Sequence, residues 1–171
     1  EMCKGTMEKR FGVSFDEVCP SGEPLIWTMY LKEDRVYEDI PSFKVLKQIT
    51  EVQLEEFNQE FPTKAMNLVL FQDAMNHISR ISRILQNPRG NALLIGVGGS
   101  GKQSLTKLAA YISRAVPHQI TITKTYNIGN LLEDWKPLCF AAGVKATGVA
   151  FIFTDKEIKD EVRNRLPSTL T

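Results

Sequence analysis

The sequence predicts an α/β protein of three layers, in which helices cover both faces of a parallel sheet. The first observation is a short apolar run at 92–97 that leads into the glycine-rich stretch 96–104 and then into a helical pattern. The second observation is that strand-like runs at 119–124 and 149–155 follow, with another helical pattern between them. Strands separated by helices in this order require crossover connections, which favour a parallel sheet.

The chain before this pattern is predicted to be mainly helical. Residues 1–41 have weak periodicity and several turn signals, so no regular element is assigned there. Ser42 is expected to cap a helix that continues to about Glu60 and that Pro62 ends. The apolar face of this helix comprises Phe43, Leu46, Ile49, Leu54 and Phe57.

A second amphipathic helix is expected from Phe71 to Leu85, because apolar residues recur there at spacings of three and four. Its inner face comprises Phe71, Ala74, Met75, Ile78, Ile81 and Leu85. The segment Asn87–Gly90 has the composition of a turn. The helical N-terminal part is therefore expected to end just before the apolar run.

The second half of the chain is predicted to alternate between strands and helices. The expected elements are a buried strand at 92–97, a helix from near Gly101 to about Arg114 closed by Pro117, a strand over Gln119–Lys124, a helix from Asn130 to Ala142 capped by Gly143, and a buried strand over 149–155. The first of these helices should bury Leu105, Leu108, Ala109 and Ile112. Pro137 should kink the second helix or shift its start.

Composition narrows the function classes. The chain has 171 residues and a net charge of +1, which gives no electrostatic reason to expect nucleic acid or a membrane as partner. Its three cysteines form no CxxC pair, so we expect neither a zinc site nor a redox motif. We expect the protein to work in a reducing intracellular compartment. No apolar run approaches the ~20 residues that span a bilayer. The chain begins with Glu1, and we expect it to be a fragment of a longer protein.

The strongest motif is the string Gly96-Val97-Gly98-Gly99-Ser100-Gly101-Lys102-Gln103-Ser104, which fits the phosphate-loop signature G-x-x-x-x-G-K. Glycines let the backbone adopt positive φ and approach phosphate oxygens closely. Successive N–H groups can then form an anion-binding nest, to which the following helix adds its positive end. Lys102 supplies a full positive charge for the outer phosphates. The motif therefore predicts a nucleotide-phosphate site.

The same glycines also satisfy G-x-G-x-x-G, the dinucleotide fingerprint, at Gly96, Gly98 and Gly101. A dinucleotide fold needs an acidic residue near the end of its second strand to bind the ribose, and none occurs between Lys102 and Leu132. A kinase glycine loop requires valine where Gln103 stands, and the chain has no His-Arg-Asp sequence. The phosphate loop is the favoured interpretation.

The metal and catalytic positions are less regular than the loop. The residue after the lysine is normally Ser or Thr, whose hydroxyl binds Mg²⁺, but here it is Gln103, followed by Ser104. Asp155, at the end of the last predicted strand, suits a ligand of Mg²⁺ or its water. The usual catalytic Glu is replaced by Lys156, and Glu157 comes one residue later. We expect nucleotide binding with weak or no hydrolysis.

The strings around the loop resemble dynein heavy chains of the axonemal type, in particular their fourth AAA+ module. The similar strings are Met66–Phe71, Gln86–Leu105, Ala141–Val144 and Phe151–Glu161. The resemblance implies an AAA+ phosphate-loop NTPase module over residues 62–161, incomplete at its C-terminal end. Residues 1–61 would be the end of the preceding module, and 162–171 depart from the family pattern as a divergent tail.

The resemblance also implies roles for individual residues. Gly96, Val97, Gly98, Gly99, Ser100, Gly101, Lys102, Gln103 and Ser104 would hold the phosphates of ATP or ADP, Leu68 and Val69 would lie against the adenine, Asp155 and Ser104 would hold Mg²⁺, and Glu157 would be the candidate catalytic residue. The module would tune the motor's cycle rather than drive it.

The implied setting is a motor in a cilium or flagellum, within the cytoplasm and its cytoskeleton. The implied partners are the neighbouring AAA+ modules, microtubules, and the light and intermediate chains of dynein. Two alternatives remain open. One is a structural module whose nucleotide site is vestigial, and the other is an unrelated phosphate-loop ATPase or dinucleotide enzyme.

Overall fold

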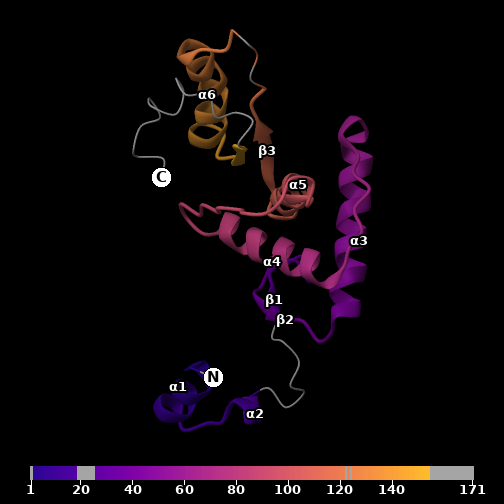
Figure 1. The fold of residues 1–171 in the computed structure, drawn as a ribbon, viewed down its shortest axis with the longest axis vertical. Coiled ribbons are helices and arrows are strands. Elements are labelled where there is room, and N and C mark those ends of the chain that lie inside the picture. Colours follow the sequence, from indigo (N-terminus) through magenta and orange to yellow (C-terminus); the bar gives the residue numbers. More distant parts are fainter. Residues whose placement is uncertain (1, 19–25, 122, 124, 155–171) are drawn as a thin grey trace. The chain divides into compact units, whose positions relative to one another are not determined.

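The computed structural model describes residues 2–18, 26–121, 123 and 125–154, and the chain divides into two compact units, residues 1–46 and 47–171 (Figure 1). The first unit begins with α1 (Met2–Phe11) and α2 (Phe15–Val18). Ser14 begins α2 by accepting the N–H of Glu17 at 3.2 Å, while the Glu17 carboxylate accepts the N–H of Ser14 at 2.8 Å. This reciprocal pair satisfies two amides that the helix start would otherwise leave without partners.

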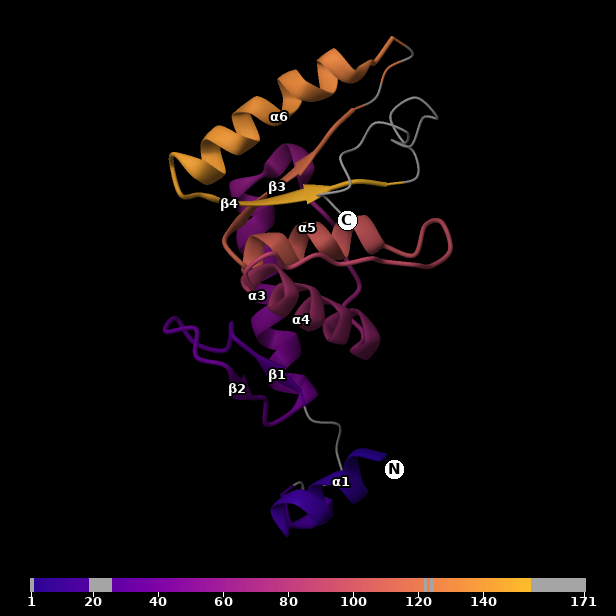
Figure 2. The ribbon, with the colours of Figure 1, turned by 90° about the vertical axis from the view of Figure 1, so that its left-hand side faces the viewer.

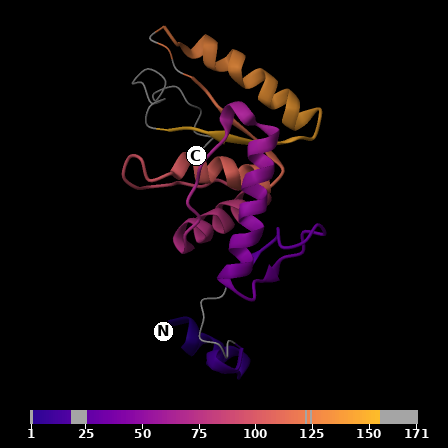
Figure 3. The same ribbon diagram turned by 90° about the vertical axis from the view of Figure 1, so that its right-hand side faces the viewer.

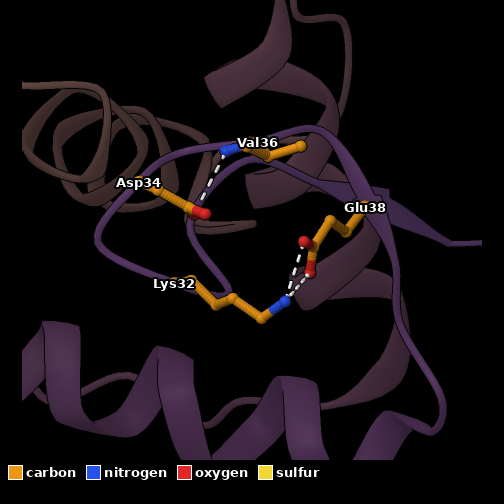
Figure 4. Close-up of polar contacts among 4 residues, drawn as sticks. All are labelled: Lys32, Asp34, Val36 and Glu38. Carbon is orange, nitrogen blue, oxygen red and sulfur yellow. Dashed lines mark hydrogen bonds and ion pairs between the residues drawn. The ribbon is translucent and has the colours of Figure 1, made fainter.

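A small antiparallel hairpin, which the sequence analysis did not predict, completes the first unit. Its strands are β1 (Trp27–Thr28) and β2 (Glu38–Asp39), and the rings of Trp27 and Tyr37 stack with centroids 5.6 Å apart. In the connecting loop, the Lys32 ammonium lies 2.8 and 2.7 Å from the two Glu38 carboxylate oxygens (Figure 4). The hydrogen bond to Glu38 raises the pKa of Lys32, with the carboxylate charge adding to the effect.

Helix α3 (Phe43–Glu60) matches the first helix predicted from the sequence. The Ser42 hydroxyl accepts the N–H of Val45 at 3.4 Å, which confirms Ser42 as the cap. The buried residues of α3 are Leu46, Thr50, Leu54 and Phe57, at spacings of four, four and three. A short 3₁₀ turn, η1 (Pro62–Lys64), follows, and Pro62 stands at its start as expected of a residue that cannot continue an α-helix.

Helix α4 (Gln72–Gln86) confirms the second predicted helix. Its buried face contains Ala74, Met75, Ile78 and Ile81 from the predicted stripe, together with Ser79 and Ser82. Phe71 is the N-cap and is exposed, so it does not belong to that face. The turn at Asn87–Gly90 is also confirmed, since the Gly90 N–H donates to the Asn87 carbonyl at 3.0 Å.

The α/β part contains α5 (Lys102–Ile112), β3 (Ala115–Gln119), α6 (Ile128–Gly143) and β4 (Gly148–Ile152). Strands β3 and β4 pair in parallel, with Pro117 opposite Ala150, and α6 forms the crossover between them. Helix α5 contacts one face of this sheet and α6 contacts the other, as Figure 2 and Figure 3 show from opposite sides. The predicted three-layer arrangement is therefore present around a small parallel sheet.

The buried strand predicted at 92–97 is wrong. These residues form no strand, and the side chains of Leu93, Ile95 and Val97 are 87%, 87% and 79% exposed. Within the described residues the parallel sheet consists of β3 and β4, and 92–97 pairs with neither. An apolar run of strand length becomes buried only where neighbouring strands and helices cover it.

The predictions for the later elements need two smaller corrections. The strand expected over Gln119–Lys124 lies earlier, at Ala115–Gln119, and includes Pro117. Proline is tolerated there because β3 pairs with β4 alone among the described strands and so lies at an edge of the sheet. Gly143 is the last residue of α6 rather than its cap, which is Val144.

Helix α6 begins two residues before the predicted start. The Asn127 side chain accepts the N–H groups of Gly129 and Asn130, and the Asn130 side chain accepts the N–H of Asn127. This cap fixes the start, and α6 continues past Pro137 to Gly143. In the described part of the chain no helix is both long and apolar enough to cross a membrane.

A small apolar cluster against α6 lies next to a half-buried polar pair. Ile120 and Leu131 are buried there, with Tyr126, Trp135 and Phe153 packed against them. The Tyr126 hydroxyl donates to an Asp134 carboxylate oxygen at 2.5 Å. Burial raises the pKa of Tyr126 well above its usual range, and the hydrogen bond and charge of Asp134 act in the same direction. The protonated hydroxyl is therefore the form that stabilises the fold.

We predict that Tyr126→Phe lowers the free energy of unfolding by about 1 to 2 kcal/mol at pH 8, because it removes a hydrogen bond to a charged acceptor. The folded state holds this proton more tightly than the unfolded state, whose tyrosine pKa is about 10. The stabilisation is thus complete below pH 10 and is lost as pH rises above it. Urea unfolding should show that the difference in free energy of unfolding between the parent and Tyr126→Phe is smaller at pH 11 than at pH 8. An equal difference in free energy of unfolding at the two pH values would contradict this prediction. Asp134→Asn is the control, because it keeps a hydrogen-bond acceptor for Tyr126 but removes the charge.

Candidate functional site

The glycine-rich stretch forms a loop that ends at the first residue of α5 (Figure 2). Gly99 and Gly101 adopt positive φ angles of 79° and 77°. Gly101 is the N-cap of α5, so the backbone turns through a left-handed residue immediately before the helix. Residues with a Cβ rarely adopt this conformation, which explains why the pattern places glycine at both positions.

The start of α5 presents backbone donors to the loop. The Leu105 N–H donates to the Gly101 carbonyl at 2.9 Å, which begins the hydrogen-bond ladder of the helix. The first-turn amides before it have no acceptor within an α-helix and carry the positive end of the helix dipole. Gln103 and Ser104 lie in this first turn and are half-buried. The helix start therefore offers the local field that an anion requires.

The Lys102 ammonium group lies inside the loop that precedes it. Nζ donates to the carbonyl oxygens of Gly96 at 2.7 Å and Val97 at 2.6 Å, and to the Ser100 hydroxyl at 3.1 Å. No carboxylate among the described residues forms an ion pair with it. The charge is thus held by neutral dipoles, and a phosphate oxygen is a stronger acceptor than any of the three groups that now hold it.

Space around the loop differs between the glycines. A Cβ added at Gly96 would lie 3.5 Å from the Lys102 Nζ, whereas one added at Gly98 would meet nothing within 4 Å. The loop is exposed from Gly96 to Ser100, and Gly101 is half-buried. The residues present therefore fit a phosphate group, since left-handed glycines, a helix start and an ammonium group occur together over 96–104.

The predicted adenine residues lie on a segment that the fold fixes by an interaction the sequence analysis missed. The Asn58 side chain, on α3, donates to the Met66 carbonyl at 2.9 Å and accepts the Met66 N–H at 2.7 Å. Just beyond this clamp, Leu68 is half-buried, Val69 is 80% exposed and Leu70 is buried. An Asn whose side-chain NH₂ and oxygen both bond to the backbone of one residue leaves no pattern in the sequence. Only the fold reveals it. The adenine role of Leu68 and Val69 stays a prediction.

The predicted metal and catalytic residues are only partly described. Ser104 lies in the first turn of α5, next to the loop. Asp155 and Glu157, together with Lys156, lie outside the described residues, which end at Thr154, two residues after β4. Among the described residues there is no group of three or more His, Cys, Asp or Glu side chains that could hold a metal ion. The Mg²⁺ site therefore stays a prediction that rests on the order of residues.

Comparisons with known proteins agree with the resemblance seen in the sequence. Residues 66–169 match a family model described as "P-loop containing dynein motor region D4". The chain is 47% identical over 142 residues to dynein axonemal heavy chain 8 of Mus musculus, covering 83% of this chain and 3% of that protein. It is 50% identical over 127 residues to dynein axonemal heavy chain 5 of Rattus norvegicus, covering 74% of this chain and 4% of that protein.

A third relative has a similar level of sequence identity. The chain is 46% identical over 142 residues to the "Dynein alpha chain, flagellar outer arm" of Chlamydomonas reinhardtii, covering 81% of this chain and 3% of that protein. The chain thus spans a small part of the length of each of these relatives. The matched stretch of the family model includes the whole glycine loop and α5.

We predict that Gly101→Ala destabilises the chain by about 1 to 2 kcal/mol more than Gly98→Ala, because only the first would force a Cβ into a left-handed conformation. Gly98 is the matched control, since its φ is not in the left-handed range and its surroundings are open. Urea unfolding of both variants measures the difference. Equal destabilisation by the two substitutions would contradict the loop geometry described here.

Proposed function

Because the chain belongs to the dynein heavy chain family, in which it matches motor region D4, we propose that it binds ATP or ADP through residues 96–104 as a regulatory module of an axonemal motor. The observation that carries the proposal is the loop itself. Two left-handed glycines lead into α5, and the Lys102 ammonium lies against oxygen atoms of the same loop. These are the groups that hold the phosphates in nucleotide sites of this class.

The wider setting is proposed from the relatives, whose names are those of axonemal, ciliary and flagellar dyneins. We infer that the chain serves within a heavy chain of an axoneme, in a cilium or flagellum. There it would contact neighbouring AAA+ modules, and the whole motor would act on microtubules together with light and intermediate chains. When bound, Mg²⁺ would neutralise phosphate charge, with Ser104 and Asp155 as the residues that would hold it.

A second candidate function is a structural module whose nucleotide site is vestigial and whose role is contact with neighbouring modules. Gln103 favours it, because its side chain replaces the compact hydroxyl that usually binds Mg²⁺ at this position. Lys156, in place of the usual catalytic Glu, favours it as well. Both residues affect hydrolysis more than binding, since the loop's hold on phosphate comes from backbone amides and Lys102. We therefore propose binding with little turnover as the function of this module.

We predict that Lys102→Ala weakens ATP binding at least about tenfold, because it removes a charged donor to the outer phosphates whose loss costs about 1.5 kcal/mol or more. Equilibrium binding of labelled ATP to the heavy chain that carries this sequence measures the effect. Lys107→Ala is the matched control, since it removes a lysine from the same helix outside the loop. If the parent binds no nucleotide, the vestigial module is the correct interpretation. If Lys102→Ala binds ATP as tightly as the parent does, the proposed role of Lys102 is wrong.

We also predict that this chain, assayed by itself, turns over ATP more slowly than about 1 s⁻¹, the lower end of ordinary enzyme rates. A steady-state phosphate-release assay with saturating Mg²⁺ measures it. Gln103→Ser restores a hydroxyl next to the lysine, and it should make nucleotide affinity more dependent on Mg²⁺ than in the parent. Turnover by the unaltered chain at or above 1 s⁻¹ would contradict the proposed regulatory role.

A further inference from the structure

The second unit contains an open cavity of about 530 Å³ that is separate from the glycine loop. It is lined by residues from the end of α3, the turn η1, α5 and the two strands of the sheet. Its apolar lining comprises Phe57, Phe61, Val116, Pro117, Ile120 and Ile152. None of these residues belongs to the predicted nucleotide site, so the cavity needs an explanation of its own.

An aromatic cluster fixes one wall of the cavity. The ring of Phe57 is 5.2 Å from that of Phe61 and 5.4 Å from that of Tyr111, and the contact with Tyr111 is edge-to-face. Phe57 is only 1% exposed, so its position is set by the core. Such a preformed apolar wall can receive side chains without first paying the entropy cost of ordering itself.

Two lysines give the cavity a positive charge. Lys64 follows Phe61 in η1, and Lys107 lies on α5. Neither ammonium group has a hydrogen bond or an ion pair with another described residue. Among the described residues, no acidic side chain lines the cavity. The lining thus combines an apolar body with two cationic groups that lack counter-charges.

The charge and the apolar lining of the cavity together indicate what kind of segment would bind there. An apolar cavity with lysines at its edge fits a segment that places an apolar side chain inside and a carboxylate beside the ammonium groups. We expect side chains to enter the cavity, because its lining consists mainly of apolar residues from several elements. This chain matches only about 3% of the length of the mouse relative, and in a heavy chain of similar length such a segment would be available at high effective concentration.

We propose that this cavity is the docking site for an acidic and apolar segment of the same heavy chain, from outside residues 1–171. The proposal rests on the proposed function in one respect, namely that the chain acts within a longer heavy chain. It does not depend on nucleotide binding, because no cavity residue lies in the glycine loop. The segment inserts an apolar side chain against Phe57 and Phe61 and pairs its carboxylates with Lys64 and Lys107.

Zero-length carbodiimide cross-linking of the intact heavy chain, followed by peptide mass spectrometry, tests the proposal directly. The reagent joins an amine to a carboxylate only where the two are in contact. We expect Lys64 or Lys107 to be coupled to an Asp or Glu of the same polypeptide outside this chain. The ion pair between Lys136 and Glu133 serves as the internal positive control in the same digest.

A matched pair of variants separates docking from chance contact and leaves both lysines in place. Val116→Trp fills the cavity, and Leu132→Trp adds the same bulk at a position on α6 outside it, where the parent side chain is equally exposed at 54%. Val116→Trp should lower the yield of the external cross-links at least about fivefold, because overpacking opposes insertion. Leu132→Trp should leave the yield unchanged.

Four outcomes would overturn the proposal. They are the absence of external cross-links while the Lys136–Glu133 link forms, persistence of those links in Val116→Trp, coupling to a different protein, and coupling to a second copy of this heavy chain. Labelled ATP binding by the same samples reports on the nucleotide site. Loss of ATP binding with the cross-links retained would therefore reject the proposed function of the loop and leave the docking site standing.

Discussion

The burial of α5 on two sides is the constraint on which the rest of the second unit depends. Leu105, Leu108, Ala109, Ala110 and Ile112 are all buried, and the helix contacts both α4 and β3. Each large apolar side chain buried in this way contributes about 1.5 to 3 kcal/mol. Two serine bonds add direction, since Ser82 donates to the Ala109 carbonyl at 3.3 Å and Ser113 donates to the Ser82 carbonyl at 3.2 Å. The N-terminus of α5 is therefore held in place before any ligand arrives.

The position of that N-terminus decides what the loop can do. Gly99 and Gly101 supply the positive φ angles with which the loop reaches this fixed helix start. Lys102 remains within its own loop through two carbonyls and a hydroxyl. In the proposed function, an incoming phosphate would replace these acceptors of the Lys102 ammonium with a stronger one.

How much the sequence could predict depended on whether a feature was local. Ser42, the middle of the α4 stripe and the inner face of α5 follow from spacing within one helix, and these were predicted correctly. At the ends of the α4 stripe, Phe71 is exposed and Leu85 is half-buried. The strand at 92–97 was predicted from an apolar run alone, but burial depends on neighbours that the run does not contain. The start of β3 was placed too late for the same reason. A strand that contains Pro117 is expected only when the strand is known to lie at an edge of the sheet. The Asn58 clamp and the hairpin at Trp27 depend on tertiary contacts and leave no periodic signal.

The same distinction separates the two halves of the proposed function. Binding of phosphate rests on backbone conformation and one lysine, which are local to 96–104 and follow from glycine spacing. Hydrolysis also needs side chains that hold Mg²⁺ and activate water. At two such positions the chain carries Gln103, within the same loop, and Lys156, from a later part of the chain, where a hydroxyl and a carboxylate are usual. A module built in this way keeps the groups that bind phosphate and lacks some of the usual groups for hydrolysis. Nucleotide occupancy can then bias the positions of neighbouring segments without a cycle of turnover here, which is what a regulatory module within a larger motor requires.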